Sequence, residues 1–136
     1  MGNRRRAREM ALRILFETDF TTGSVDDVLA RLLSDEMTEP ETATFLADLA
    51  HAYSHRIKEI DQLIESRSDN WKLGRMASVD RNLLRLGVCE ILSLSDVPKS
   101  VSINEYLEIA KVYGTEDSSA FINGILDKID KPVVKS

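Results

Sequence analysis

Residues 78–92 read SVDRNLLRLGVCEIL, and this stretch decides the fold. Its apolar side chains recur with the spacing of a helix and also fill other sides of that helix; they are Val79, Leu83, Leu84, Leu86, Val88, Cys89, Ile91 and Leu92. A helix that is apolar around much of its circumference is buried on several sides. The stretch therefore predicts a helix, with Ser78 as its N-cap, in the centre of a helical bundle.

The sequence that follows this stretch predicts two more helices. Residues 96–98, Asp-Val-Pro, indicate a turn. Ser102 and Glu105 have the spacing of a capping box, so we expect a helix to open there. We expect it to end at Gly114, because glycine readily takes the left-handed conformation that closes helices. A last helix is predicted over about residues 118–130.

The sequence that precedes the stretch also follows a helical period. It predicts a first helix over about residues 4–20 and a short second helix capped by Ser24. Thr38 and Glu41 form another capping box, and the long helix that they open is expected to run to about Ser66. No strand-like alternation of useful length occurs. The sequence therefore predicts an all-α fold, a bundle of six or seven helices.

The composition excludes several classes of protein. The single cysteine, Cys89, allows neither an intrachain disulfide nor a zinc site built from several cysteines. It lies within an apolar helix, so we interpret it as a core residue rather than a nucleophile. No apolar run approaches the roughly 18 residues of a membrane helix, and Arg13 and Glu17 interrupt any signal-peptide pattern. We expect a cytoplasmic protein without a membrane partner.

Basic residues crowd into the start of an acidic chain, as Arg4, Arg5, Arg6 and Arg8. Residues 1–16 hold five arginines and one glutamate, a net charge of +4, so the remainder of this −5 chain carries −9. Such asymmetry is typical of a basic arm that meets nucleic acid. Cations at a helix N-terminus also oppose the helix dipole, which bound phosphates would relieve. A solvated face with arginine–glutamate pairs is the equally open alternative.

Phe16 lies about two turns beyond Arg8 and allows two interpretations. An aromatic ring near a basic patch can stack on an unpaired base. The residues alone favour packing in the core, near Phe20.

Two further patterns point to chemistry only weakly. Asp48, His51, His55 and Glu59 share one helical stripe, but a solvated polar face explains them better than a metal site. The helix after Gly114 loosely matches the second helix of a helix-turn-helix. It lacks basic residues near its start, and Glu116 and Asp117 sit where phosphates would approach, so the match is weak.

The strongest signal is a set of motifs that occur in order along the chain. They are RRRARE at 4–9, WKLGRM at 71–76, DRNLLRLGVCEIL at 80–92, VP at 97–98, SINEYLEIAKVYG at 102–114 and FINGILDK at 121–128. Together they resemble the NusB family of bacterial transcription antitermination factors, and the resemblance spans residues 4–130.

The resemblance implies about seven helices in two small helical subdomains, residues about 1–68 and about 69–136. It implies no enzymatic activity, no cofactor and no metal. Family members bind boxA, a short single-stranded RNA in the leaders of ribosomal RNA operons, together with NusE, a small-subunit ribosomal protein. The pair joins an antitermination complex on RNA polymerase. The family includes monomers and dimers, so a homodimer is also allowed.

The resemblance also assigns roles by position. Phe16 matches a position where family members can present a tyrosine to RNA, so stacking is expected without the hydroxyl. Asp80 and Arg85 lie in a stretch near the RNA and the partner. Asp117 matches an acidic position at the NusE interface, although an acid there also suits the dipole of the next helix. The basic RNA-binding segment corresponds to Arg4, Arg5, Arg6 and Arg8.

Two alternatives remain within the same framework. The chain could be a NusB-like RNA-binding domain that serves a ribosomal RNA methyltransferase. Such domains are normally fused to a cofactor-binding domain, and the chain ends at Ser136 without such a motif. It could also be a protein-only dimeric scaffold, in which the arginines pair with acids of a partner.

Overall fold

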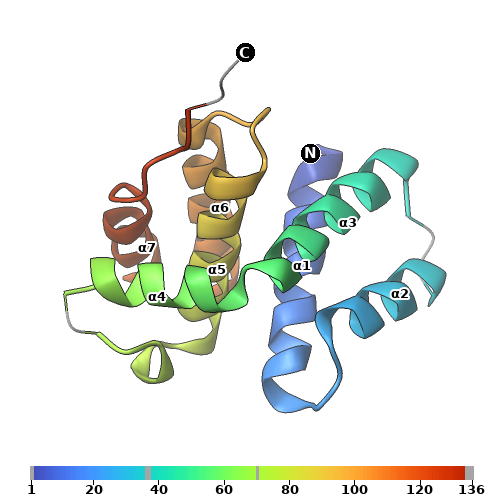
Figure 1. Cartoon of the computed structure of the whole chain (residues 1–136), viewed down its shortest axis with the longest axis horizontal. Coiled ribbons are helices and arrows are strands. Elements are labelled where there is room, and N and C mark those ends of the chain that lie inside the picture. Colours follow the sequence, from blue (N-terminus) through green and yellow to red (C-terminus); the bar gives the residue numbers. More distant parts are fainter. Residues whose placement is uncertain (1, 36–37, 70, 134–136) are drawn as a thin grey trace.

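The chain is all-α, as predicted. The computed structural model describes residues 2–35, 38–69 and 71–133, which form seven α-helices and no strand (Figure 1). The helices are α1 (Asn3–Phe20), α2 (Val25–Asp35), α3 (Pro40–His55), α4 (Ile57–Arg67), α5 (Ser78–Ser93), α6 (Lys99–Tyr113) and α7 (Ser118–Leu126), with a 3-10 turn at Leu73–Arg75. No helix in these ranges combines the length and apolarity that crossing a bilayer requires.

Helix α5 occupies the centre of the molecule, which confirms the prediction from its sequence. It contacts α1, α3, α4, α6 and α7. In Figure 1, α1, α2 and α3 lie on one side of α5 and α7 lies on the other, while α6 overlaps α5 in this view. Because α5 is enclosed from several sides, most of its apolar residues are fully buried; these include Leu83, Leu84, Leu86, Val88, Cys89 and Ile91. A subdomain boundary at about residue 68 stays a prediction, since α4 packs on α5.

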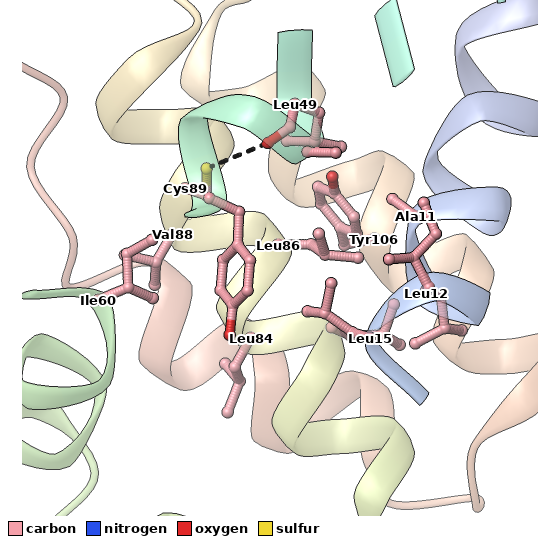
Figure 2. Packing of buried hydrophobic residues seen from close by; sticks show 14 of the residues in the cluster. Ala11, Leu12, Leu15, Leu49, Ile60, Leu84, Leu86, Val88, Cys89 and Tyr106 are labelled. Atoms are coloured by element: carbon pink, nitrogen blue, oxygen red, sulfur yellow. Dashed lines mark hydrogen bonds between the residues drawn. The ribbon is translucent and has the colours of Figure 1, made fainter. Parts of the chain in front are cut away.

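The core brings the two groups of helices together around α5. Figure 2 shows Leu86 and Cys89 of α5 among side chains of α1, α3 and α6. The Cys89 thiol is completely buried and lies 3.8 Å from the carbonyl oxygen of Leu49. Burial raises the pKa of this thiol to about 12, so it stays protonated at neutral pH. The interpretation of Cys89 as a core residue is confirmed.

One long helix was expected from the capping box to Ser66, and this prediction is wrong. The chain breaks at Arg56, which has φ −131° and ψ 19°, so α3 and α4 are separate helices. The Arg56 guanidinium holds this corner: it binds both carboxylate oxygens of Glu59 at 2.9 Å and the Ser93 hydroxyl at 3.0 Å. The apolar spacing continues across the break, because Tyr53 and Ile60 both face the core on either side of it.

The predicted helix starts are correct in one case and displaced in two. Ser24 caps α2, since its hydroxyl accepts the backbone N–H of Asp27 at 3.1 Å. Helix α3 begins at Pro40 with Glu39, rather than Thr38, at the N-cap position. Helix α5 has Ala77 at its N-cap, and Ser78 is the first helical residue. Each displacement is a single position.

The predicted start of α6 is wrong, for a reason that matters for function. The helix begins at Lys99 with Pro98 at the N-cap, so Ser102 and Glu105 lie inside it. Both side chains bind other helices instead of capping their own. Helix α6 ends at Tyr113 as expected. Gly114, however, has φ −96°, not the left-handed conformation.

Gly114 is required by a close approach rather than by its backbone conformation. A Cβ at this position would clash with the Ser118 hydroxyl oxygen. That hydroxyl accepts the backbone N–H of Thr115 at 2.9 Å and so ties the α6–α7 connection together. Helix α7 ends at Leu126, four residues before the predicted end. The chain then tightens into a turn, in which the N–H of Ile129 bonds to the carbonyl of Leu126 at 3.1 Å.

Candidate nucleic-acid interface

The four arginines at the start of α1 have four different environments. Arg8 is the most enclosed, with a side chain only 3% exposed. Its Nε and Nη2 donate to the two carboxylate oxygens of Glu90 on α5, at 2.9 and 2.7 Å. The guanidinium also lies over the Phe45 ring, 4.9 Å from its centroid. Arg8 therefore binds within the protein and, in this conformation, offers no surface to a nucleic acid.

Glu90 is fully buried and accepts four hydrogen bonds. In addition to Arg8, the Ser102 hydroxyl donates to it at 2.6 Å and the Tyr106 hydroxyl at 2.8 Å, both from α6. Burial alone would lower the pKa of Arg8, but the hydrogen bonds and charge of Glu90 raise it, so the arginine stays charged. This network, Arg8–Glu90–Ser102–Tyr106, joins α1, α5 and α6. We call it the buried ion network.

Arg5 adds a second ion pair between α1 and α6. Its Nε and Nη2 donate to the Glu105 carboxylate at 2.6 and 2.8 Å, and Arg8 Nη1 reaches the same carboxylate at 3.4 Å. The hydrogen bonds from Arg5 lower the pKa of Glu105 below its ordinary value. The side chains of Arg5 and Glu105 are 19% and 20% exposed, so this pair lies at the margin of the buried ion network.

Arg4 and Arg6 are the exposed members of the cluster. Arg4 pairs with Asp96 at 3.3 Å and lies over the Phe45 ring, yet its side chain remains 44% exposed. Arg6 is exposed beside a groove. Carboxylates of the chain itself thus neutralise Arg4, Arg5 and Arg8. These three therefore do not need bound phosphates to offset their unfavourable interaction with the helix dipole. RNA contact by each of the four arginines stays a prediction, and the geometry favours Arg4 and Arg6.

A groove of about 370 Å³ lies between α1 and the C-terminal end of α6. We call it the α1–α6 groove; it is lined by Arg6, Glu9, Met10, Leu12, Arg13, Phe16 and Tyr113. Phe16 is partly buried against the core and also lines the groove. Its position is therefore compatible with both interpretations, packing in the core and stacking on a base. Phe20, its expected core neighbour, is instead 76% exposed.

Asp80 and Asp117, far apart in sequence, come together in one hollow. We call it the acidic hollow; it measures about 360 Å³ and is lined by Trp71, Arg75, Met76, Ala77, Asp80, Asp117 and Phe121. Trp71 is 53% exposed, and its ring meets that of Phe121 edge-on, with ring centroids 6.5 Å apart. Asp80 Oδ1 is buried without a hydrogen-bond partner. The hollow thus combines exposed aromatic surface with carboxylate groups.

Arg85 belongs to a different region, near the C-terminal end of α1. It binds the Asp61 carboxylate at 2.9 and 3.1 Å and reaches Asp19 at 3.4 Å. Burial alone would raise the pKa of Asp19, but hydrogen bonds from Asn82 and Arg81 hold it below its ordinary value. Arg85 therefore connects α1, α4 and α5, and it lines neither the α1–α6 groove nor the acidic hollow.

The polar stripe considered for metal binding does not persist as one helical face. The break at Arg56 separates His51 and His55 from Glu59, which pairs with Arg56 instead. Within the described part of the chain, no three His, Cys, Asp or Glu side chains cluster so that they could hold a metal ion.

Sequence reasoning missed Glu90 and misread Glu105. The signal for Glu90 was available: a lone carboxylate inside an otherwise apolar helix requires a buried partner, because an unpaired charge in the core is costly. Nothing in the sequence pointed to Arg8 as that partner, since the two residues lie 82 positions apart.

Known proteins match this chain over nearly its whole length. The model of the NusB family matches residues 5–131. The chain belongs to the NusB family. The NusB transcription antitermination protein of Geobacter sulfurreducens is 46% identical over 132 residues, which cover 95% of this chain and 94% of the relative. That of Myxococcus xanthus is 41% identical over 133 residues, 95% of each chain. These NusB relatives are antitermination factors rather than enzymes, and this chain is accordingly a non-enzymatic protein.

Solved structures agree with this assignment. The structure of T. maritima NusB has a TM-score of 0.88 and 37% sequence identity, and the match covers 95% of this chain and 93% of that one. The NusB chain in a crystal structure of the antitermination factors NusB and NusE in complex with dsRNA has a TM-score of 0.84 and 25% identity, with 93% and 95% covered.

Proposed function

We propose that this protein binds boxA, a single-stranded RNA of ribosomal RNA operon leaders, together with NusE. The pair then joins the antitermination complex on RNA polymerase in the cytoplasm. Family membership supports the general role, and the NusB–NusE–RNA neighbour supports both kinds of partner. The observation that carries the proposal on this chain is the basic, aromatic-lined face of α1.

This face has the two features that binding of single-stranded RNA needs. Arg6 and Arg13 are exposed and line the α1–α6 groove, and Arg4 is exposed at the start of the same helix, on the side of α3; all three can approach phosphates. Phe16 presents an aromatic ring in the α1–α6 groove, where an unpaired base can stack. The rest of the chain is strongly acidic, so it repels RNA elsewhere and confines binding to this face.

Arg8 and Arg5 serve this face indirectly. Their ion pairs with Glu90 and Glu105 fix α1 against α5 and α6. A helix held in this way keeps Arg4, Arg6 and Phe16 in a constant arrangement, which lowers the ordering cost of binding. We therefore assign the phosphate contacts of the arginine cluster to Arg4 and Arg6.

The acidic hollow is the proposed docking surface for NusE. Asp80 and Asp117 offer negative charge to a basic ribosomal protein, and Trp71 offers an exposed aromatic anchor. Docking would also relieve the unsatisfied Asp80 Oδ1 if NusE brings a donor to it. A basic partner bound here enlarges the positive surface available to the RNA.

The RNA assignment is tested with the double variant Arg4→Gln/Arg6→Gln. We expect weaker binding of boxA RNA and a shallower dependence of log affinity on log salt, because each lost phosphate contact removes about 0.7 from the slope for a single strand. Fluorescence anisotropy at several salt concentrations measures both quantities. The matched control is Lys58→Gln/Arg67→Gln, which removes two exposed cations from α4. Equal affinity and slope in the two double variants would contradict the assignment.

The docking assignment is tested with Asp117→Lys. Reversing this charge in the acidic hollow should weaken NusE binding while leaving the thermal unfolding midpoint nearly unchanged, because Asp117 makes no side-chain capping hydrogen bond in α7. Isothermal titration with NusE measures the effect. Glu39→Lys, an exposed position at the start of α3, is the control. Wild-type affinity for NusE in Asp117→Lys would remove this residue from the interface.

A further inference from the structure

The α1–α6 groove contains a polar pair that the proposed function does not yet use. The Tyr113 hydroxyl lies 3.2 Å from Glu9 Oε2 and donates a hydrogen bond to it across the groove. Tyr113 is 49% exposed and is the last residue of α6. The charge of Glu9 raises the pKa of Tyr113, so the phenol remains a proton donor at neutral pH.

The groove walls surround this pair with groups that suit a nucleotide. Phe16 lies on α1 two turns beyond Glu9, and Phe16 has no atom that can hydrogen bond to a base edge. Arg6 and Arg13 line the same groove. Arg13 lies three residues before Phe16 and seven residues after Arg6. Stacking surface, a hydrogen-bonding pair and cationic groups thus share one concavity.

We propose that the Glu9–Tyr113 pair reads the edge of an unpaired RNA base that stacks on Phe16, with Arg13 at the neighbouring phosphate. This inference rests on the proposed RNA-binding function and extends it to residues of two helices. The ligand is one nucleotide of the bound single strand whose base carries an amino group.

The chemistry of the pair determines which bases fit. An ionised carboxylate only accepts hydrogen bonds, and Tyr113 occupies one of the two oxygens of Glu9. We assign the other oxygen, Oε1, to an amino or imino donor of the base. Guanine, cytosine and adenine each present an amino group, whereas uracil presents a single N–H between two carbonyl oxygens that the carboxylate repels. The groove should therefore discriminate against uracil.

The combination of two arginines with the Glu9 carboxylate favours RNA over an acidic peptide as the occupant. Arg6 and Arg13 would attract an acidic partner, but the Glu9 carboxylate inside the groove repels the acidic side chains of such a peptide. A nucleotide avoids this conflict, because its negative charge lies on the phosphate and its donors lie on the base edge. The groove also contains Arg6, one of the two exposed arginines at the start of α1.

The test uses the full chain and a set of RNAs derived from boxA in which each position is changed in turn to uracil. For the wild type, we expect uracil at one amino-bearing position to weaken binding about tenfold, the size of one well-formed carboxylate–base contact. Glu9→Gln should reduce this discrimination to less than threefold. Tyr113→Phe should reduce it as well, and the double variant should lose no more than the stronger single variant, because the two side chains act as a pair.

The control variant is Glu108→Gln, which removes a negative charge from α6 outside the groove. It separates loss of base discrimination from the general rise in RNA affinity that any lost negative charge brings. Circular dichroism melts confirm that all variants fold.

The outcomes distinguish this inference from the proposed function. If the wild type binds no boxA RNA, both fail. If it binds RNA but Glu9→Gln and Tyr113→Phe keep the wild-type base preference, the reading by Glu9 and Tyr113 is wrong and the RNA-binding function stands. If Tyr113→Phe weakens NusE binding and leaves RNA binding unchanged, the groove is a protein-docking site and the inference is overturned.

Discussion

At the scale of single residues, the same type of side chain performs different tasks according to burial. Arg8 and Arg4 lie one helical turn apart on α1, and both lie over Phe45. Arg8 is enclosed with Glu90, whereas Arg4 meets an exposed acid, Asp96. A buried pair whose partner is removed leaves an uncompensated charge in the core, while an exposed pair is worth little.

This difference predicts unequal effects on stability. Arg8→Met should lower the free energy of unfolding by about 3–5 kcal/mol, because Glu90 loses its ionic partner in the core. Arg4→Met should lower it by less than about 1 kcal/mol. Urea denaturation followed by circular dichroism measures both. A cost of under 1 kcal/mol for Arg8→Met would show that the buried ion network is not a structural element.

Cys89 provides a second prediction at this scale. Its thiol is buried and its pKa is raised to about 12, so almost no thiolate exists at pH 8. A disulfide reagent such as DTNB should therefore leave the native protein unmodified for hours and react stoichiometrically in 6 M guanidinium. Rapid reaction of the folded protein would place Cys89 outside the core.

At the scale of elements, the approach of α5 to α7 depends on Gly87. A Cβ at this position would lie 2.8 Å from one methyl carbon of Leu126, and Leu126 is completely buried. Gly124, on α7, has nothing within 4 Å of a Cβ. The two glycines therefore differ in function although both lie within helices.

Alanine at the two positions should act in opposite directions. Gly87→Ala should destabilise the protein by about 1–3 kcal/mol through overpacking against Leu126. Gly124→Ala should stabilise it by about 0.5–1 kcal/mol, because alanine favours a helix interior and meets no neighbour here. Thermal melts compare the two variants. A higher melting temperature for Gly87→Ala than for Gly124→Ala would contradict the described packing of α5 on α7.

The elements also show what could be predicted from sequence. Periodicity located the helices and the central place of α5, because burial leaves an apolar pattern along the chain. It did not reveal the break at Arg56, since the apolar spacing continues from Tyr53 to Ile60 across it. Arg56 holds that corner through the nearby carboxylate of Glu59 and through a hydrogen bond to Ser93, 37 residues away, and no local pattern contains the second contact.

The functional roles of the arginine cluster, Phe16, Asp80 and Asp117 stay predictions. The structure brings Asp80 and Asp117, which the sequence does not place together, into one hollow. The sequence did not show which of the arginines lie in buried ion pairs and which are exposed. Glu105 looked like a capping residue, because Ser102 and Glu105 have the spacing of a capping box whether or not a helix begins there. Their actual partners lie on α1 and α5.

At the scale of the whole molecule, ion pairs between distant segments connect the chain. The Arg5–Glu105 pair joins α1 to α6. Asp19, which binds Arg81 and Asn82, joins α1 to α5. The carboxylates of Glu105 and Asp19 have pKa values below the ordinary 4.5 of glutamate and 3.8 of aspartate. Because the folded protein holds these groups ionised, the unfolded chain binds more protons in this range.

Stability should therefore fall on acidification. The contribution of these carboxylates is complete above about pH 4.5 and is lost as the pH falls through their lowered pKa values. Urea unfolding at a series of pH values from 7 to 3 measures the decline. Arg5→Gln should flatten it, because Glu105 then titrates closer to its ordinary pKa. An equal decline in Arg5→Gln would mean that the Arg5–Glu105 pair contributes nothing to acid sensitivity.

Joint recognition of boxA RNA by this chain and NusE can be measured by comparing three RNAs. The affinity of the full chain for single-stranded boxA RNA, for a scrambled strand of equal composition and for a duplex is determined with and without saturating NusE, at one fixed salt concentration. We expect boxA to bind more tightly than either control RNA, and we expect NusE to raise the affinity for boxA by at least tenfold. Equal affinity for boxA and the scrambled strand, with no gain from NusE, would contradict joint recognition.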